Sequence, residues 1–170
     1  MFLFTAIHAR EWIAPATATY MMNEIITKPN NYWDIVDNFD FYFIPVLNPD
    51  GYRFTFDSNR LWRKSRSENN SPVGCLGVDI NRNFGKYEKK ACKRRKSIKK
   101  FPNCWLKCKI SDFQWNSCAG CSSGDPCSAT FRGLTPFSES EGDHMRAFIM
   151  ENSDVNWQYY VSFHSYSQVS

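Results

Sequence analysis

Short apolar runs that alternate with helical patterns are the feature that most constrains the fold of this sequence. Residues 2–7, 39–47 and 157–163 are rich in aromatic and β-branched side chains, as buried strands are. Residues 15–26 and 138–151 show the spacing of apolar side chains that is typical of helices. This alternation predicts an α/β fold with a mixed, largely parallel sheet flanked by helices.

Three local signals refine this prediction. Ser138 followed by Glu141 reads as a capping box at the start of the second helix. Residues 48–51, Asn-Pro-Asp-Gly, are a strong turn signal after the second strand. Residues 76–80 are a further short strand candidate that leads into a polar segment.

Two histidines follow directly after predicted strands. In α/β folds, ligands gather beyond the carboxyl ends of the strands, where His8 and His164 are expected to lie. Glu11 comes three residues after His8, and zinc accepts imidazole and carboxylate ligands together. A surface salt bridge at a strand end and a structural histidine are the alternatives. His144 lies in a polar helix and is interpreted as a solvated surface residue.

Other polar side chains surround these strand ends. Asp79 is a plausible acceptor that would orient one metal-bound imidazole. Arginine is the preferred partner of a carboxylate, because its planar guanidinium donates two parallel hydrogen bonds. Five arginines lie in segments that lead off strands: Arg10, Arg60, Arg63, Arg66 and Arg82. Asn81 places an amide beside Arg82, whereas Arg66 is interpreted as surface charge.

Size and composition indicate one sizeable globular domain. The 170 residues are 42% hydrophobic and 22% charged, which fits a soluble protein with a proper core. No apolar run approaches the roughly 20 residues that a membrane span requires. Residues 1–7 are apolar but show neither a basic leader nor a small-residue cleavage site, so we expect a strand here and no signal peptide within this chain.

The net charge of +4 arises from a single stretch, residues 86–112. This stretch holds eleven Lys or Arg and two Asp or Glu, whereas the remainder has ten basic and fifteen acidic residues. All seven cysteines fall between Cys75 and Cys127, and the odd number leaves at least one thiol unpaired or paired outside the chain. Disulfides in an oxidising compartment and a metal bound by reduced cysteines both remain open.

Five segments follow one another in a distinctive order: residues 8–13 (HAREWI), 48–52 (NPDGY), 59–64 (NRLWRK), 78–84 (VDINRNF) and 163–167 (FHSYS). Together they resemble one known family, the zinc metallocarboxypeptidases of the pancreatic A/B type. The resemblance covers nearly the whole chain outside the basic stretch.

The resemblance implies a metal site and a carboxylate clamp. His8, Glu11 and His164 would hold one Zn²⁺, and Asp79 would accept a hydrogen bond from the far nitrogen of His8. Arg63 would polarise the scissile carbonyl and stabilise the oxyanion. The residues that would bind the substrate at its terminal carboxylate and neighbouring subsites are Asn81, Arg82, Arg10, Arg60 and Tyr166.

The sequence also departs from the family pattern. Relatives carry a tyrosine lid, the specificity pocket and the catalytic glutamate beyond the segment at 163–167, and a propeptide and further strands before residue 1. A general base contributes roughly 10²–10⁴ in rate, so we expect residues 1–170, as a partial peptidase catalytic domain, to be inactive alone. The preferred C-terminal residue stays undefined for the same reason.

The basic stretch interrupts the resemblance, and joining Gly85 to Phe113 restores it. Residues 86–112 are interpreted as a gene-model artefact, such as a retained intron. The alternatives are a nucleic-acid-binding or nuclear-targeting segment and a structural zinc knot built from the pairs Cys104/Cys108 and Cys118/Cys121. The family resemblance also implies a disulfide between Cys75 and Cys127.

The predicted function is zinc-dependent hydrolysis of the C-terminal peptide bond by a secreted, monomeric enzyme. Its partners would be the C-termini of peptides and proteins, with no nucleic acid and no membrane involved. Two rivals remain: a non-catalytic remnant that binds zinc or peptide, and a basic nucleic-acid-binding protein that acts through residues 86–112.

Overall fold

The structure is a computed structural model that describes residues 1–68, 74–85 and 121–165. The chain divides into two compact units. The first comprises Met1–Trp62 with the C-terminal residues from Tyr159 onward, and the second comprises Arg63–Gln158. Tyr166 and residues 86–112, which the sequence analysis singled out, lie outside the described residues.

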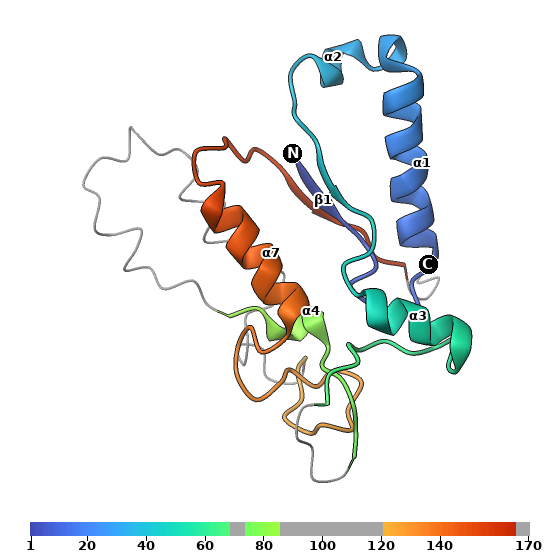
Figure 1. Ribbon diagram of the computed structural model, residues 1–170, viewed down its shortest axis with the longest axis vertical. Helices are drawn as coiled ribbons and strands as arrows, with labels where there is room; N and C mark the ends of the chain where they lie inside the picture. The colour runs from blue at the N-terminus through green and yellow to red at the C-terminus, as the bar shows by residue number, and fades with distance from the viewer. Residues whose placement is uncertain (69–73, 86–120, 166–170) are drawn as a thin grey trace, which may run out of the picture. The chain divides into compact units, whose positions relative to one another are not determined.

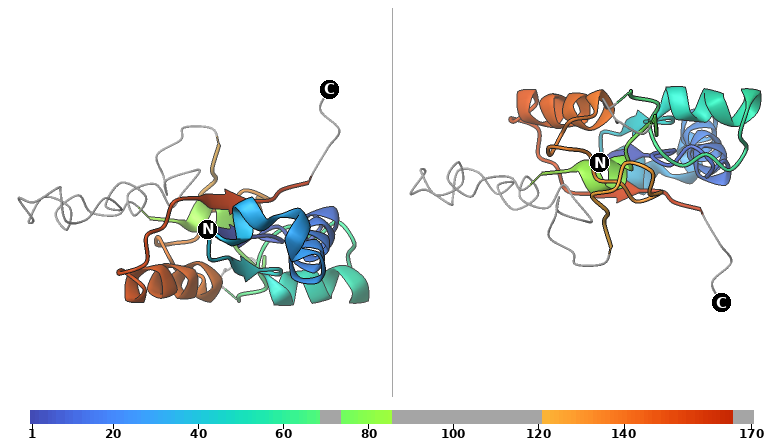
Figure 2. Two further views of the ribbon diagram at one scale, coloured as in Figure 1. Left: turned by 90° about the horizontal axis from the view of Figure 1, so that it is seen from above. Right: turned by 90° about the horizontal axis from the view of Figure 1, so that it is seen from below.

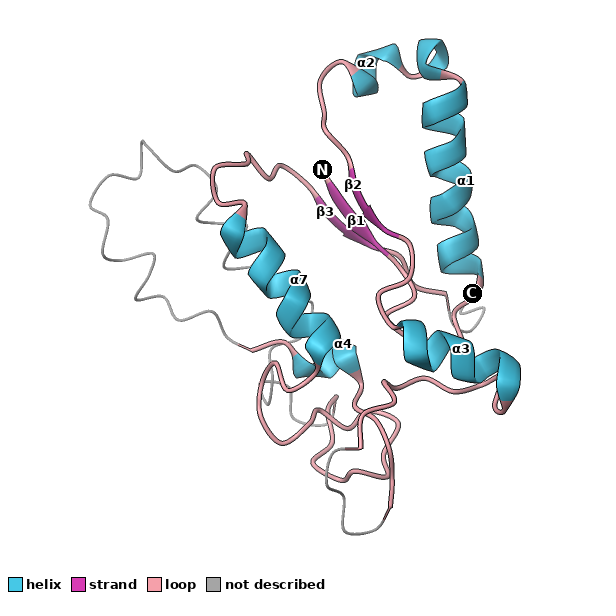
Figure 3. Cartoon of the chain, in the orientation of Figure 1, coloured by secondary structure: helices cyan, strands magenta, loops and turns pink. Residues whose placement is uncertain are grey.

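The first unit is built on a three-stranded parallel sheet. Its strands are β1 (Phe2–Phe4), β2 (Tyr42–Ile44) and β3 (Tyr160–Ser162), in the order β2-β1-β3 (Figure 3). Phe2 lies opposite both Tyr42 and Tyr160 in the register. All three residues of the central strand are buried, which explains why its sequence is continuously apolar. The predicted α/β class with parallel strands is confirmed.

The first unit also contains helices. They are α1 (Ile13–Thr27), the 3₁₀ helix η1 (Pro29–Asn31), α2 (Trp33–Val36) and α3 (Pro49–Asp57) (Figure 1). Figure 2 shows α1 nearly end-on beside the strands. Its buried side consists of small residues, Ala14, Pro15 and Ala18. The helix predicted over 15–26 is therefore confirmed and is slightly longer at both ends.

The second unit contains fewer regular elements among the described residues. Helix α4 spans Ile80–Asn83 and α7 spans Ser140–Glu151. Cys75 and Cys127 form a disulfide with their Cα atoms 5.1 Å apart, the pair that the family resemblance implies. Loops fill most of the rest, with one parallel bridge between Ser123 and Phe131.

The strands are shorter than the apolar runs that predicted them. Ala6, two residues after the end of β1, has a φ of +50°, which takes the chain out of the extended conformation. Pro45 lacks a backbone N–H and follows the last residue of β2. Backbone pairing nevertheless continues, because Leu47 N donates to Thr5 O at 3.0 Å. Each run contains a strand of only three residues, and only β1 is buried over its whole length.

The turn predicted at residues 48–51 is wrong, because these residues begin α3. Asn48 is the N-cap, and its side chain accepts a hydrogen bond from Gly51 N at 2.9 Å. Pro49 occupies the first helical position, where its missing N–H costs nothing. The Asn-Pro-Asp-Gly sequence suits a helix start as well as a turn, since a side-chain acceptor followed by a proline favours both.

The strand predicted at residues 76–80 is absent among the described residues. Gly77 has a φ of +77°, and a Cβ there would lie 2.0 Å from Ser65 O, so the chain bends at a position that only glycine permits. Asp79 then caps α4 by accepting from Asn81 N at 3.1 Å. Val78 and Ile80 are buried where this segment leads into the helix.

The predicted capping box at the start of α7 is also wrong. The helix begins at Ser140, and its N-cap, Glu139, makes no side-chain capping hydrogen bond. Ser138 instead donates to the carboxylate of Glu139 at 3.0 Å and accepts from Asn83. A contact with a residue 55 positions away thus replaces the local motif.

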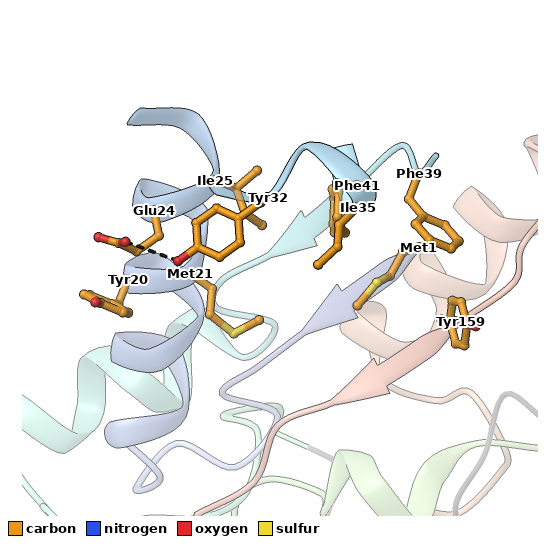
Figure 4. Close-up of a pocket in the computed structure, with 10 residues that line it drawn as sticks. All are labelled: Met1, Tyr20, Met21, Glu24, Ile25, Tyr32, Ile35, Phe39, Phe41 and Tyr159. Atoms are coloured by element: carbon orange, nitrogen blue, oxygen red, sulfur yellow. Dashed lines mark hydrogen bonds between the residues drawn. The ribbon is translucent and has the colours of Figure 1, made fainter. Parts of the chain in front are cut away.

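An apolar cavity of about 430 Å³ lies at the amino ends of the three strands (Figure 4). Met1, Phe41 and Tyr159, which each precede a strand, line it together with side chains of α1 and α2. Of its lining residues, Glu24 carries the carboxylate, which accepts hydrogen bonds from Tyr32 and Lys28. Among the described residues, no helix is both long enough and apolar enough to cross a membrane.

Candidate metal centre

The carboxyl ends of β1 and β3 bring together the three residues that the sequence analysis selected as metal ligands. The chain leaves β1 and reaches His8 after Ala6 turns it; Glu11 N then donates to His8 O at 3.2 Å, which starts the turn into α1. His164 lies two residues after the end of β3. The parallel order of these neighbouring strands therefore places residues 156 positions apart at one edge of the sheet.

Ligand atoms of the three residues converge on one point. His8 Nδ1 lies 2.7 Å from Glu11 Oε1, and His164 Nδ1 lies 3.0 Å from Glu11 Oε2. The two imidazole Nδ1 atoms are 3.2 Å apart. Neighbouring ligands of a tetrahedral zinc are about 3.3 Å apart, given bonds of about 2.0–2.1 Å. The donor set and its spacing therefore fit Zn²⁺.

Burial differs among the three residues in a way that suits a metal with an open position. His8 and Glu11 are buried, whereas the His164 side chain is 31% exposed. A catalytic zinc keeps one position for water or substrate. The exposed side of His164 gives this group access to solvent.

Glu11 is held in its charged form. Burial alone would raise the pKa of its carboxyl group, but hydrogen bonds and charge interactions with His164 and His8 lower that pKa well below its usual range. Ser165 N also donates to Glu11 Oε2 at 3.2 Å. A deprotonated carboxylate is the form that binds a metal ion.

Polar contacts around the group orient its members. Ser162 Oγ lies 3.1 Å from His164 Nε2, the second ring nitrogen of that imidazole. Asn48, buried at the start of α3, donates to Ile7 O at 3.3 Å and so supports the backbone that carries His8. Sequence reasoning missed both contacts. The Asn48 contact has no local sequence signal, because it joins residues 41 positions apart.

Two of the predicted substrate-binding arginines meet on the surface of the first unit. Arg60 Nη1 donates to Arg10 O at 2.9 Å, and the Arg60 guanidinium carbon lies 3.7 Å from the centre of the Trp12 ring. Trp12 in turn stacks on Phe56 at 4.4 Å. Arg60 is therefore fixed by stacking and by a carbonyl at one place.

The second unit holds the other predicted site residues close together along the chain. Asp79 Oδ2 accepts from Arg63 Nε at 3.1 Å and from Arg63 Nη2 at 2.7 Å. Arg82, in α4, donates through Nε to Cys121 O at 2.7 Å and through Nη1 to Asn81 O at 3.2 Å. The predicted contact between Asp79 and His8 joins the two units and stays a prediction.

Two further predictions concern His144 and the cysteines of the alternative zinc knot. His144 lies on the exposed side of α7, as expected for a surface residue. Cys121 is disulfide-bonded, which leaves it without the thiolate that the alternative zinc knot requires. The other three cysteines of that knot lie outside the described residues.

Known proteins with similar sequences are carboxypeptidases and related proteins. Carboxypeptidase B from Astacus astacus is 40% identical over 169 residues, which cover 99% of this chain and 46% of that protein. An inactive metallocarboxypeptidase from Ajellomyces dermatitidis is 34% identical over 168 residues, covering 95% of this chain and 23% of that protein. The chain thus spans less than half the length of these relatives.

This chain is also similar to solved structures. Bovine thrombin-activatable fibrinolysis inhibitor, solved in complex with tick carboxypeptidase inhibitor, matches with a TM-score of 0.72 and 32% identity. The match covers 99% of this chain and 46% of that one. A family model described as zinc carboxypeptidase matches residues 1–170. The chain belongs to the zinc carboxypeptidase family.

Proposed function

We propose that this chain carries the zinc-binding and substrate-anchoring part of a metallocarboxypeptidase that removes the C-terminal residue of peptides and proteins. The convergence of His8, Glu11 and His164 carries the proposal, because their spacing fits a tetrahedral ion. Family membership supports the reaction class. Residues 1–170 would form part of one peptidase catalytic domain.

The proposal gives each polar group a role. Zinc held by the three ligands would act as a Lewis acid toward the scissile carbonyl and would lower the pKa of a bound water. Arg63 would polarise the same carbonyl and stabilise the oxyanion. The substrate's terminal carboxylate would bind Asn81 and Arg82. The subsites for the neighbouring residues of the peptide would be lined by Arg10, Arg60 and Tyr166.

The contacts of Arg82 support its assignment as a carboxylate clamp. Hydrogen bonds through Nε and Nη1 fix the plane of its guanidinium. A guanidinium that is held in place loses less side-chain entropy when it binds a carboxylate through two parallel hydrogen bonds. Asn81 is buried beside it in α4, so the amide and the guanidinium form one rigid element.

Turnover would need a general base. The family resemblance assigns that role to a glutamate outside residues 1–170, so we propose that these residues alone bind zinc and peptide without hydrolysing the peptide. A non-catalytic zinc- or peptide-binding role for the whole protein is the second candidate. The 34% identity to an inactive metallocarboxypeptidase favours it.

The same proposal covers the compartment, the partners and the oligomeric state of the protein. The Cys75–Cys127 disulfide supports an oxidising compartment, so we propose a secreted, extracellular protein. Its partners would be peptide C-termini, and it would act as a monomer. A nucleic-acid-binding role would depend on residues 86–112, which lie outside the described residues.

Zinc titration tests the metal assignment. The 170-residue chain, stripped of metal and titrated against a chromophoric chelator, should bind one Zn²⁺. His164→Ala and Glu11→Gln should each weaken binding by at least about 100-fold, since a ligand is lost outright. His144→Ala, on the exposed side of α7, is the matched control and should bind like the parent. Equal affinity in all four proteins would exclude this site.

Peptide binding tests the clamp. The zinc-loaded chain should bind a short peptide with a free C-terminal carboxylate more tightly than the same peptide with a C-terminal amide. Arg82→Gln should abolish this preference. Arg146→Gln removes an exposed arginine of the same unit and should preserve the preference. A parent chain that binds acid and amide equally would refute the proposed function.

A further inference from the structure

Glu139 is a buried carboxylate that the proposed reaction does not use. Its Oε2 accepts hydrogen bonds from Ser65 Oγ at 2.5 Å and from Ser67 Oγ at 2.6 Å. Its Oε1 accepts from Ser138 Oγ at 3.0 Å. Burying a carboxylate costs free energy unless hydrogen bonds satisfy it. The three hydroxyl groups that donate to this side chain therefore indicate a specific role for Glu139.

One side of this cluster leads to Arg63 and Asp79. Ser65 Oγ, which donates to Glu139, accepts from Val78 N at 2.8 Å, and Ser65 N donates to Val78 O at 2.8 Å. Ser65 lies two residues after Arg63, and Val78 immediately precedes Asp79. Ser65 thus joins the two segments whose side chains form the Arg63–Asp79 ion pair, and Glu139 fixes the hydroxyl of Ser65.

The other side leads to the end of α4. Glu139 N donates to Asn83 Oδ1 at 3.1 Å. Asn83 Nδ2 lies within hydrogen-bond distance of Arg132 O, Thr135 O and Ser138 Oγ, at 2.9, 3.0 and 2.9 Å. Asn83 is buried and is the last residue of α4, which lies beside the start of α7 (Figure 1).

Helix α4 needs such support. It has four residues, and a helix this short is not stable by itself in water. Asp79 caps its first turn, and Asn83 anchors its last residue. Both anchors therefore support the backbone that carries the amide of Asn81 and the guanidinium of Arg82.

We propose that Glu139 and Asn83 are positioning residues for the substrate clamp. Glu139 fixes the segments that carry Arg63 and Asp79 through Ser65 and Ser67, and Asn83 fixes α4 with Asn81 and Arg82. This inference rests on the proposed function for the meaning of the clamp, but the positioning itself can be tested without a substrate. Neither residue touches the peptide.

The first test compares matched variants of the zinc-loaded 170-residue chain. Glu139→Gln keeps the volume but turns one acceptor oxygen into a donor, so the serine hydroxyls lose an acceptor. Glu141→Gln removes a carboxylate from the first turn of the same helix and is the control. We expect Glu139→Gln to lose about 10- to 100-fold of the preference for the C-terminal acid over the amide, since displacements near 1 Å can have this effect.

Zinc affinity separates positioning from general stability. The metal ligands belong to the first unit, so Glu139→Gln and Asn83→Ala should bind Zn²⁺ like the parent chain. Loss of zinc binding together with peptide binding would overturn the inference in favour of a general structural role. Unchanged preference for the acid peptide in Glu139→Gln would overturn it as well.

A second readout needs no ligand and remains informative if the proposed function fails. The Nε–H groups of Arg63 and Arg82 donate to Asp79 and to Cys121 O, and ¹⁵N NMR can follow their exchange with solvent. Exchange should be about 10-fold faster or more in Glu139→Gln and unchanged in Glu141→Gln. Equal exchange in both would refute the positioning role. Ser67→Ala, which removes one donor, should show a smaller increase and serves if Glu139→Gln does not fold.

Discussion

Replacement of Asp79 by Asn offers a sharp test of how the second unit is held together. Asp79 is fully buried, and its two oxygens serve different partners: Oδ2 accepts from Arg63 and Oδ1 accepts from Asn81 N. An asparagine side chain has one oxygen, so it can satisfy only one of these partners. Either the guanidinium or the first turn of α4 loses its acceptor, and the ion pair disappears in both cases.

The size of the effect follows from the burial of the pair. Breaking a buried ion pair from one side costs about 3–5 kcal/mol, because the remaining charge stays in a poorly solvated place. Arg63 is 13% exposed, and Asn keeps one hydrogen bond, so we expect about 3 kcal/mol of destabilisation. With a urea slope of about 2 kcal/mol per M, the unfolding midpoint should fall by roughly 1.5 M.

The control is an exposed ion pair in the same unit. Asp143 and Arg146 are paired in the first turns of α7 with side chains 43% and 44% exposed. Exposed pairs contribute about 0–1 kcal/mol, so Asp143→Asn should shift the midpoint by less than about 0.5 M. Urea unfolding followed by circular dichroism measures both. Equal shifts for Asp79→Asn and Asp143→Asn would refute the reasoning.

Three further predictions concern other parts of the chain. Cys127→Ser should cost about 4 kcal/mol of stability, the chain-entropy value for a disulfide that spans 52 residues, and calorimetry under reducing and oxidising conditions measures this difference. Asn48→Ala should cost about 1–2 kcal/mol in urea unfolding, because α3 loses its N-cap, whereas replacement of the exposed Asn38 by Ala should cost less than about 0.5 kcal/mol. In the metal-free chain, the pKa of Glu11 lies below its ordinary value of 4.5, so the charged carboxylate stabilises the fold at pH values above 4.5. The stability advantage of the parent chain over Glu11→Gln should therefore shrink as the pH falls below about 4.5. A constant difference from pH 7 to pH 3 would contradict the last of these.

The sequence predicted the layout of the first unit because its signals are local or follow from simple topology. Apolar runs located all three strands, and the rule that ligands gather at the carboxyl ends of parallel strands placed His8 near His164. Glu11 belonged to the prediction because it follows His8 by three residues, within reach of the same ion. The convergence of these side chains needed no knowledge of the loops between them.

Other features depended on contacts that a single sequence does not display. The turn expected at residues 48–51 is a helix start, since Asn48 caps α3. The capping box expected at Ser138 gave way to a bond with the neighbouring Glu139 and a bond with Asn83, which lies 55 positions away. Gly77 ended the strand expected at 76–80, because its left-handed backbone brings it against Ser65. In the last two cases a partner far along the chain outweighed the local pattern.

The environment of zinc in the 170-residue chain tests the central claim most directly. X-ray absorption spectroscopy of the zinc-loaded chain at the zinc edge distinguishes nitrogen and oxygen ligands, at about 2.0–2.2 Å, from sulfur at about 2.3 Å. A site made by His8, Glu11 and His164 predicts two imidazoles with oxygen ligands and no sulfur, and it predicts loss of the imidazole signal in the double variant His8→Ala/His164→Ala. Sulfur ligands, or a spectrum that this double variant leaves unchanged, would place the zinc elsewhere and contradict the account.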